Sequence, residues 1–538
     1  MVHLPIRLSR TQAIGAAAGA AAIVVAAVLL VVHVVLGASL GAKLEASNLA
    51  RVKILEPVVI VFDQPVDPRG VSVTASPATP LKLSWSGQRL VVAAAGHWQP
   101  SQRYTLALDK VLTRSHRASL TGWKGTFTTQ PDVAVAAYEV DGKPVAAGTA
   151  GMTSASTLSV VFTQPMRTSS VSVNLGGRPV TSLSWSAQDT VATFAEPTLA
   201  PFQTTTLGVS RTAVSAKGDE IADPGQVSLQ VMGLEPANST TGVTAGFQTK
   251  TPVEIVVENS GAARPQTGLQ NADIVYEYIS EYSITRMTAI YFNNVPPLVG
   301  PVRSCRMINP YLDYSFDGVF MCSGASVGTL HYLFGGNGLP LVPGIINDFD
   351  NGNHFFRVGF KYAPHNLYTD SARILRFRRE WSPGHSPTFV VDPPHPDSGA
   401  GVSAPAPSVP LHFVTYHYDP ASQQYLRFDH GAPFVDAGTG RQLHVKNVII
   451  LHVPFHYTNW IEDENGGAHS VWYSMLGSGP ADIYSDGKVI HVTWHMGSST
   501  ESYFHNHNPV YFTDAQGNVV RLNTGLTWVH LLGVGQTQ

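Results

Sequence analysis

The stretch TGLQNADIVYEY at residues 267–278, followed by TRMTAIYF at residues 285–292, decides the fold of the largest part of this chain. Both runs are rich in β-branched and aromatic residues, which is typical of strands, and turns that contain Gly and Pro separate them from later motifs. Those turns carry Arg303, Ser326 and His365. Because binding and catalytic groups concentrate on loops held by a rigid scaffold, we expect the functional site in this region.

Length and composition predict a multidomain, β-rich protein. At 538 residues the chain is too long for one core, and domains of about 150 residues would make three or four. Charged residues are only 13%, against about 25% in typical globular proteins, while turn-forming residues are plentiful. The net charge of -3 is small and the basic residues are scattered, so we expect no nucleic-acid partner.

The N-terminal segment predicts a membrane anchor. Arg7 and Arg10 precede a long uncharged, apolar segment. About 20 apolar residues cross a bilayer, and the basic flank favours a cytoplasmic N-terminus. We therefore expect cytoplasmic residues 1–12, a single transmembrane helix at 13–42 in the cell membrane, and an extracytoplasmic remainder. The alternative is a cleaved signal peptide, because residues 38–42 are mostly small, as at a cleavage site.

An internal repeat follows the anchor. VFDQPV at residues 61–66 recurs as VFTQPM at residues 161–166, and LSWS recurs at the same spacing. Short alternating runs between frequent turns predict a β-sandwich for each copy. On the F-x-Q-P stretch the copies resemble bacterial Ig-like domains of the S-layer-protein type. We expect these all-β sandwiches at residues 48–131 and 132–236, where they act as spacers.

A series of short motifs runs through the rest of the chain: GLQNADIVYEY from residue 268, GPVRSCR from 300, APHNLYT from 363, NVII from 447, GSGPADIYSDGKVIHVTW from 477 and LNTGLTWV from 522. On these motifs the region 250–535 resembles the YerB-like family of bacterial lipoproteins, domain of unknown function 3048, with its N-terminal and C-terminal domains. The resemblance implies an exported, envelope-associated protein with no assigned reaction. This chain departs from the lipoprotein pattern by using a transmembrane anchor, with no lipid-attachment cysteine near it, and by inserting two Ig-like modules.

The expected fold class is multidomain: an N-terminal transmembrane helix, two all-β Ig-like sandwiches, an α/β lobe and a β-rich lobe. We expect the YerB-like N-terminal α/β domain at residues 247–392 and the C-terminal β-rich domain at residues 411–538. A Pro-, Gly- and Ser-rich stretch at residues 393–410 is the predicted linker.

Polar residues at the turns of the α/β lobe predict a pocket for a carboxylate or a phosphate. Arginine supplies forked donors, and neutral side chains fix the orientation of the ligand. The predicted ligand-binding residues are Arg286, Arg303, Ser304, Arg306, Ser326, His365, Asn366 and Tyr368. We expect the ligand to be a cell-envelope component, namely an anionic glycan, a peptide or a partner protein. In the alternative, Arg303 pairs with Asp313 or Glu277 to fasten the fold, and the protein is purely structural.

The sequence GASVG at residues 324–328 matches the G-x-S-x-G pattern of a nucleophile elbow between a strand and a helix. It suggests a serine hydrolase of wall or surface polymers, with Ser326 as nucleophile, His365 as base and Asp348 or Asp350 as the orienting acid. No H-G-G-G oxyanion loop precedes it. The favoured reading is that the serine caps a helix or contacts an anion.

The chain has two cysteines, Cys305 and Cys322. Outside the cytoplasm they can form a disulfide, worth about 3 kcal/mol for a loop of this length. The alternatives are two buried, small apolar residues and a reactive thiol at Cys305 activated by Arg303 and Arg306.

The 21 histidines raise the question of a metal site. On a strand, residues four apart, such as His491 and His495, lie about 13 Å apart, so one ion could not bind both. Only the pair His505 and His507, or a cross-strand set such as His452 with His491, fits the geometry. We expect neither a metal nor a cofactor.

Overall fold

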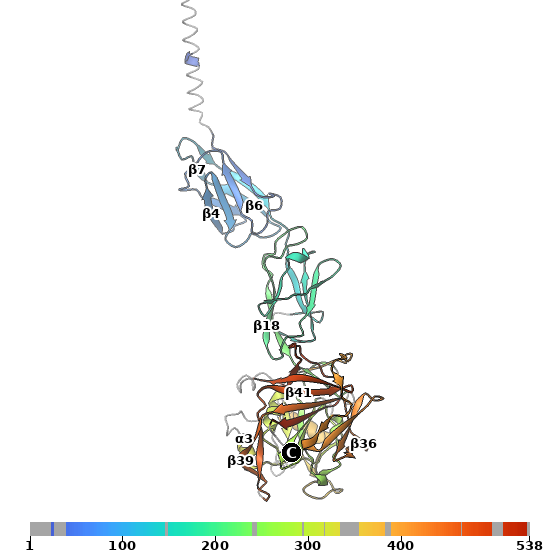
Figure 1. The fold of residues 1–538 in the computed structure, drawn as a ribbon. Helices are drawn as coiled ribbons and strands as arrows, with labels where there is room; N and C mark the ends of the chain where they lie inside the picture. The colour runs from blue at the N-terminus through green and yellow to red at the C-terminus, as the bar shows by residue number, and fades with distance from the viewer. Residues whose placement is uncertain are drawn as a thin grey trace, which may run out of the picture. The chain divides into compact units, whose positions relative to one another are not determined.

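The computed structural model describes residues 23–25, 39–145, 149–238, 245–292, 295–316, 318–333, 354–381, 389–463, 465–497 and 509–534 (Figure 1). Most of the predicted anchor, residues 13–42, therefore lies outside the described residues. Within the described ranges, no helix has the length and apolar character needed to cross a membrane. The chain forms two compact units: Met1–Ala147, Leu158–Phe194 and Thr206–Val227 make the first, and Gly148–Thr157, Ala195–Thr205 and Ser228–Gln538 the second.

The first repeat forms two small sheets with strand orders β1-β2-β5-β4 and β3-β6-β9, and a β7-β8 ribbon. The run VVIVF alternates between buried and half-buried positions, as a strand with one face in the core must. The bounds are β1 Ala42–Glu45, β2 Val58–Phe62, β3 Val73–Ser76, β4 Leu81–Ser86, β5 Arg89–Ala94, β6 Arg103–Leu108, β7 Lys110–Leu112, β8 Ser119–Thr121 and β9 Lys124–Thr128.

The second repeat contains a sheet of order β11-β10-β13-β17-β16, and β14 pairs with β15 and β18. Equivalent residues pack alike in the two repeats. Trp85 stacks on Phe62 with ring centroids 5.8 Å apart, and Trp185 stacks on Phe162 at 6.0 Å. The bounds are β10 Val135–Val140, β11 Lys143–Pro144, β13 Thr157–Phe162, β14 Val173–Leu175, β15 Arg178–Pro179, β16 Ser184–Trp185, β17 Val191–Ala195 and β18 Thr204–Val209, with a 3-10 turn at Thr168–Ser170. The Ig-like assignment itself stays a prediction.

The second unit is built on a mixed sheet of order β26-β22-β24-β23-β44-β38-β41-β42-β30, with β43 added beside β42. The sheet crosses from one predicted lobe to the other where β23 runs parallel to β44, with Ile274 opposite Thr527. The two lobes therefore share one sheet. Its strands are β22 Val253–Glu258, β23 Ile274–Glu281, β24 Ile284–Tyr291, β26 Val319–Met321, β30 Val402–Ser403, β38 Asn447–Val453, β41 Gly477–Ser485, β42 Lys488–Met496, β43 Tyr511–Thr513 and β44 Thr527–Gly533.

Both faces of the central strands of this sheet are buried, whereas β41 and β42 alternate between buried and more exposed positions. Neighbouring residues of one strand enter different cores: Val275 and Trp528 lie in one cluster, and Ile274 and Val529 in the other. Each cluster combines side chains from both predicted lobes. A strand that is covered on both faces reads as a nearly continuous apolar run, which is how IVYEY and NVIILHV appear in the sequence.

The remaining elements are short helices and turns, and strands of other sheets. The helices are α2 Asn309–Phe316, α3 Val327–Leu333 and α4 Ser371–Trp381, with 3-10 turns at Gly261–Ala263, Leu269–Asn271 and Pro410–His412. The remaining strands are β12 Thr149–Thr153, β19 Gln226–Met232, β20 Leu234–Glu235, β21 Gly246–Gln248, β25 Leu298–Val299, β27 Phe356–Arg357, β28 Leu367–Asp370, β29 Phe389–Val391, β31 Ser408–Val409, β32 Val414–Asp419, β33 Gln424–Asp429, β34 Ala432–Pro433, β35 Val435–Asp436, β36 Arg441–Gln442, β37 His444–Val445, β39 Phe455–Asp463 and β40 Ala468–Tyr473.

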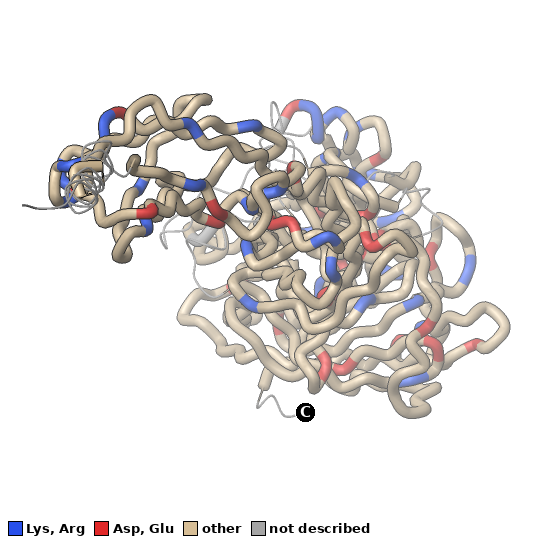
Figure 2. The backbone as a smooth tube through the Cα atoms, turned by 90° about the horizontal axis from the view of Figure 1, so that it is seen from above, with Lys and Arg blue, Asp and Glu red and all other residues tan. Residues whose placement is uncertain are grey.

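The described architecture is mostly β and multidomain, as predicted. The stretch 393–410, expected to be a plain linker, contributes β30 to the mixed sheet and pairs β31 with β32. Basic and acidic residues are interspersed along the backbone (Figure 2), in keeping with the small net charge.

Candidate functional site

A cavity of about 610 Å³ lies in the second unit, where the end of β23, the start of β24, two loops and β39 meet. Its wall includes the predicted residues Arg286, Arg303, Ser304, Arg306 and Ser326. We call it the arginine-lined cavity. Its volume is in the range of sites for small organic molecules, which is about 300–1,000 Å³.

Arg286 carries the most telling feature of this cavity. Its side chain is only 3% exposed, and its Nη2 donates to Glu281 Oε1 at 3.2 Å. Its Nε and Nη1 have no acceptor among the described residues. Burial, and then repulsion by Arg306, lowers the pKa of Arg286 to about 10, so the guanidinium stays charged at neutral pH. Each buried donor without a partner costs about 1–3 kcal/mol, which an acceptor in the cavity would offset.

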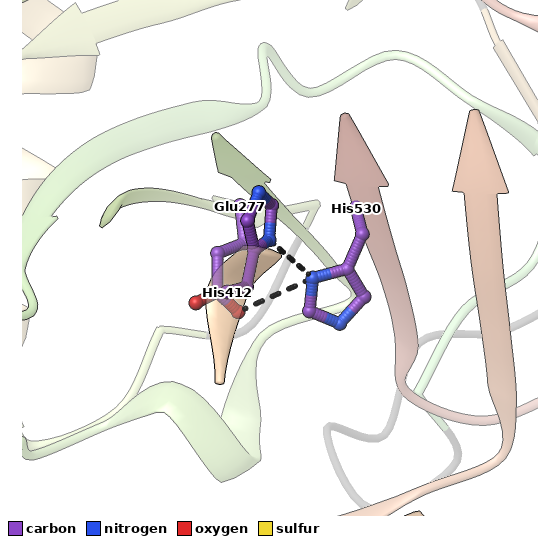
Figure 3. A group of neighbouring side chains, drawn as sticks. All are labelled: Glu277, His412 and His530. Carbon is purple, nitrogen blue, oxygen red and sulfur yellow. Dashed lines mark hydrogen bonds and ion pairs between the residues drawn. The ribbon is translucent and has the colours of Figure 1, made fainter. Parts of the chain in front are cut away.

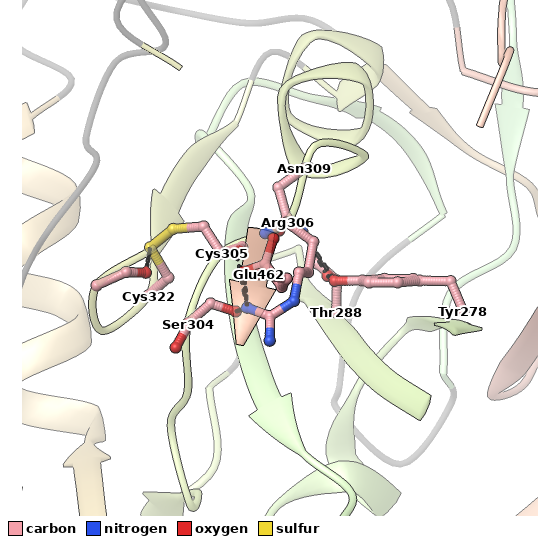
Figure 4. The surroundings of a disulfide bond; sticks show 9 residues. Tyr278, Thr288, Ser304, Cys305, Arg306, Asn309, Cys322 and Glu462 are labelled. Atoms are coloured by element: carbon pink, nitrogen blue, oxygen red, sulfur yellow. Dashed lines mark hydrogen bonds and ion pairs between the residues drawn. A yellow bond between two sulfur atoms is a disulfide. The ribbon is translucent and has the colours of Figure 1, made fainter. Parts of the chain in front are cut away.

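Arg306 contacts two carboxylates and the backbone carbonyls of its own loop (Figure 4). Its Nη2 lies 3.1 Å from Glu281 Oε2, so Glu281 bridges the two buried arginines. Its Nη1 lies 3.2 Å from Glu462 Oε1 and donates to the Cys305 carbonyl at 2.9 Å. Its Nε, like that of Arg286, has no acceptor among the described residues.

A disulfide joins Cys305 to Cys322, with 17 residues of separation and both side chains buried. It fastens the loop that bears Arg303 and Arg306 to the turn that leads into Ser326 (Figure 4). The Cys305 N–H also donates to the Gly324 carbonyl at 2.9 Å. The cross-link thus fixes the spacing of the groups on two walls of the cavity.

Ser326 acts as a helix cap. The Thr329 N–H donates to Ser326 Oγ at 3.2 Å, the contact of an N-cap serine at the start of α3. The hydroxyl in turn donates to Glu462 Oε2 at 2.9 Å. Glu462, whose side chain is almost fully buried, also accepts from Ser470 at 2.6 Å. Sequence analysis missed Glu462, because nothing local distinguishes it from other acidic residues near a turn.

His365 lies against a different carboxylate. Its Nδ1 is 2.9 Å from Glu258 Oε1, and Arg303 Nε approaches the same oxygen at 3.7 Å. Arg303 is therefore paired with Glu258, which differs from both partners considered above. Among the described residues no hydrogen bond links His365 to Ser326, so the geometry does not assemble the suggested nucleophile and base.

The remaining predicted residues either lie outside the cavity wall or lie outside the described part of the chain. Asn366 Oδ1 accepts from Arg357 Nη1 at 2.8 Å. Tyr368 is fully buried, and burial raises its pKa to about 12. Neither lines the cavity, although Leu367 between them does. Asp348 and Asp350 lie outside the described residues.

A second polar cluster, unforeseen from the sequence, lies where the 3-10 turn Pro410–His412 packs against the shared sheet (Figure 3). Glu277, His412 and His530 are buried together, with His412 Nδ1 2.9 Å and Glu277 Oε2 3.7 Å from His530 Nδ1. Such a set could hold a metal ion. However, Glu277 Oε2 already accepts from Arg427 Nη2 at 2.9 Å and from Trp528 Nε1 at 2.8 Å. Because the carboxylate is balanced by a buried cation, the cluster is better described as a hydrogen-bonded core network.

The charges in this core network follow from its burial. Burial alone would raise the pKa of Glu277, but Arg427 and the nearby imidazoles lower it to about 2. Burial lowers the pKa of His412 to about 4 and holds the pKa of His530 well below its ordinary value. At neutral pH the carboxylate is ionised and both imidazoles are neutral. A glutamate inside the apolar run IVYEY was the sequence signal, since buried acids need a partner.

The histidines singled out from the sequence are placed only in part. His452 and His491 do meet across strands, on either side of Asp482, with Nε2–Oδ2 and Nδ1–Oδ1 distances of 3.6 and 2.6 Å. Both imidazoles are at the surface. His505 and His507 lie outside the described residues.

Comparison with known proteins identifies the second unit. A family model described as the DUF3048 N-terminal domain, of unknown function, matches residues 240–381, and that of the DUF3048 C-terminal domain matches residues 408–529. YerB of Bacillus subtilis (strain 168), whose name describes it as a lipoprotein, is 32% identical over 256 residues, which cover 45% of this chain and 72% of YerB.

Solved structures give weaker matches. The crystal structure of YerB from Bacillus subtilis has 26% identity and a TM-score of 0.43, covering 56% of this chain and 94% of that one. L,D-transpeptidase 3 from Mycobacterium tuberculosis has 10% identity and a TM-score of 0.15, covering 53% and 81%. Neither structural score bears on function. The sequence matches are sufficient by themselves: this chain belongs to the DUF3048 family of proteins of unknown function and carries both of its domains.

Proposed function

We propose that this protein binds an anionic component of the bacterial cell envelope in the arginine-lined cavity. The observation that carries the proposal is the buried guanidinium of Arg286, with two N–H donors that no described residue accepts. An acceptor that reaches them gains charge-assisted hydrogen bonds, which are about twice as strong as neutral ones.

The composition of the wall supports an anion over a cation. Glu281 pairs with Arg286 and Arg306, and Glu462 pairs with Arg306, so two arginines offset these two carboxylates within the protein. Arg303 is one-third exposed and holds Glu258 only at 3.7 Å, which leaves most of its donors available. Although Asp463 also lines the cavity, the buried groups without a partner in its wall are N–H donors of Arg286 and Arg306.

Three observations support a location outside the cytoplasm. The relative YerB is named as a lipoprotein, which is a membrane-associated protein. The Cys305–Cys322 disulfide is a bond that persists in oxidising compartments. The apolar N-terminal segment has the length and basic flank of a single-pass anchor with the bulk of the chain outside. The two repeats would then act as spacers between membrane and cavity.

Co-sedimentation of the purified full-length chain with cell-wall sacculi tests the proposal. Wild type is compared with Arg303→Ala at low and at high salt. Arg441→Ala, a substitution of an exposed arginine on β36, is the matched control. We expect wild type and Arg441→Ala to pellet equally, and Arg303→Ala to remain in solution. Salt should weaken the binding because exposed charges are screened.

Equal pelleting of all three proteins would contradict the proposal, since it would place the binding elsewhere. If none pellets, the same series is repeated by calorimetry with soluble envelope anions, and failure there would support a purely structural role. The hydrolase alternative has no comparable support, because the Ser326 hydroxyl is hydrogen-bonded to Glu462.

A further inference from the structure

The rim of the arginine-lined cavity is apolar, in contrast to its wall. Val327 and Ile461 line the cavity and are 68% and 40% exposed. The residues next to them in the chain, Gly328 and Trp460, are in close contact, because a Cβ built on Gly328 would lie 2.2 Å from Trp460 Cγ. The indole of Trp460, 43% exposed, thus covers the start of α3 beside the cavity mouth. An exposed indole next to a charged cavity offers a flat apolar surface to part of a ligand.

The charge of the wall favours a ligand with a small negative charge. Four arginines and three carboxylates line the cavity, namely Arg286, Arg303, Arg306 and Arg357 against Glu281, Glu462 and Asp463. Glu258, which pairs with Arg303, brings the carboxylates to four. A phosphate monoester carries about -1.5 to -2 at neutral pH and would therefore leave more excess negative charge in the cavity than a carboxylate, whose charge is -1.

The polar part of the wall favours a ligand that bears several hydroxyl groups. Ser304 and Asp463 line it in addition to the arginines: the serine hydroxyl can donate to or accept from a ligand hydroxyl, and the carboxylate can accept from one. A peptide with an apolar side chain in this space would not use these groups. A sugar ring presents hydroxyls at its edge and C–H groups on its face, and the C–H face packs on an indole.

We infer that the ligand is a carboxylate-bearing sugar of the uronic acid type, alone or within a polysaccharide. This inference rests on the proposed function and gives it a ligand class. The carboxylate accepts from the unpaired N–H groups of Arg286, with Arg303 at its side. The hydroxyls meet Ser304 and Asp463, and the sugar face lies on Trp460. The predicted ligand thus contacts both family domains, because Trp460 belongs to β39.

Isothermal titration calorimetry on the full-length chain tests the inference with D-glucuronate, D-glucose, acetate, inorganic phosphate and N-acetylphenylalanine. We expect D-glucuronate to bind at least tenfold more tightly than each of the others. Trp460→Ala should weaken D-glucuronate binding about tenfold and leave acetate binding unchanged, and Trp460→Phe should restore most of it. Tyr457→Ala removes another exposed ring of β39, one that packs on Phe455, whereas Trp460 packs on Gly328 beside the cavity; this variant should have no effect.

The outcomes separate this inference from the proposed function. If acetate binds as tightly as D-glucuronate, and Arg303→Ala abolishes both, the cavity is an anion site and the sugar assignment is overturned. If phosphate binds more tightly than D-glucuronate, the carboxylate assignment is overturned. If N-acetylphenylalanine binds more tightly than D-glucuronate, the sugar assignment is overturned in favour of a peptide ligand. If no anion binds, or binding is the same in Arg303→Ala, the inference and the proposed function fail together.

Discussion

Replacing Glu277 by Gln should destabilise the second unit by about 3–5 kcal/mol. The substitution keeps the shape of the side chain but leaves the cation of Arg427, which is fully buried, without its counter-charge. Removing one partner of a buried ion pair typically costs this much. The pKa of Glu277 points in the same direction: Arg427 and the nearby imidazoles lower it to about 2, so the folded unit favours the ionised carboxylate.

Urea unfolding of the full-length chain, followed by hydrogen exchange of the peptide that contains β44, measures this loss. Trp528 on β44 donates to Glu277, so the exchange reports the unit that is perturbed. Asp397→Asn is the matched control, because it neutralises an acid of an exposed pair with Lys488 at 3.4 Å. An exposed pair contributes at most about 1 kcal/mol, so the control should stay close to wild type.

The double variant Glu277→Gln/Arg427→Met sharpens the test. If the cost comes from the uncompensated cation, removing Arg427 as well should recover most of the stability, since apolar replacements of buried ion pairs are often neutral. A loss below 1 kcal/mol in Glu277→Gln, equal to that of Asp397→Asn, would refute the reasoning. A double variant less stable than the single one would show that Arg427 stabilises the unit chiefly through its cation–π contacts with the rings of Phe434 and Trp528.

Three further outcomes follow from the same structure. The pKa of His412 lies at about 4 against 6.5 when unfolded, so the unfolded chain gains a proton first as pH falls, and His412 alone should lower stability by about 2 kcal/mol between pH 7 and pH 5 in urea melts. His412→Gln should remove this share and leave the further loss that comes from His530, whose pKa is also lowered by burial. Gly328→Ala should displace Trp460 and speed hydrogen exchange in β39 at least several-fold; unchanged exchange would contradict the contact. Breaking the disulfide with Cys305→Ser/Cys322→Ser should lower the free energy of unfolding by about 3 kcal/mol, whereas an unchanged urea midpoint would mean that the cross-link does not constrain the unfolded chain.

Local pattern was sufficient for the strands and turns. NVIILHV predicts a buried strand, and β38 occupies those seven residues, Asn447–Val453. The Asp-Gly turn before the next strand is present as well: Asp486 and Gly487 have φ values of 50° and 74°, which a two-residue hairpin turn requires and which this residue pair tolerates. Each of these features is decided by residues a few positions apart, so a single sequence contains the information.

Long-range pairing was not predictable in the same way. The parallel contact between β23 and β44 joins residues such as Glu277 and His530, which no local signal connects. Two apolar runs that each suit a fully buried strand can pair with many partners. Predicting two lobes with a linker was therefore reasonable from composition, but it hid the continuous sheet. Arg303 and Arg306 were singled out because they stand in a loop, and Arg286 because it comes shortly after a turn, although it lies on β24. Glu462 was not singled out, because its role depends on a contact with Arg306 from the other domain.

The ion pair between Arg306 and Glu462 shows that both family domains build the cavity wall. Arg306 comes from the N-terminal family domain and Glu462 from the C-terminal one, and the carboxylate also fixes Ser326 at the cap of α3. Neither domain alone therefore holds the cavity wall in place: without β39, Arg306 would lose a buried counter-charge, and without the α3 turn, Glu462 would lose two of its donors. Because both domains also share the sheet and its two cores, they belong to one compact unit. On the proposed function, a substitution in either domain would alter ligand binding, because β39 brings Ile461, Glu462 and Asp463 of the C-terminal domain to the cavity wall.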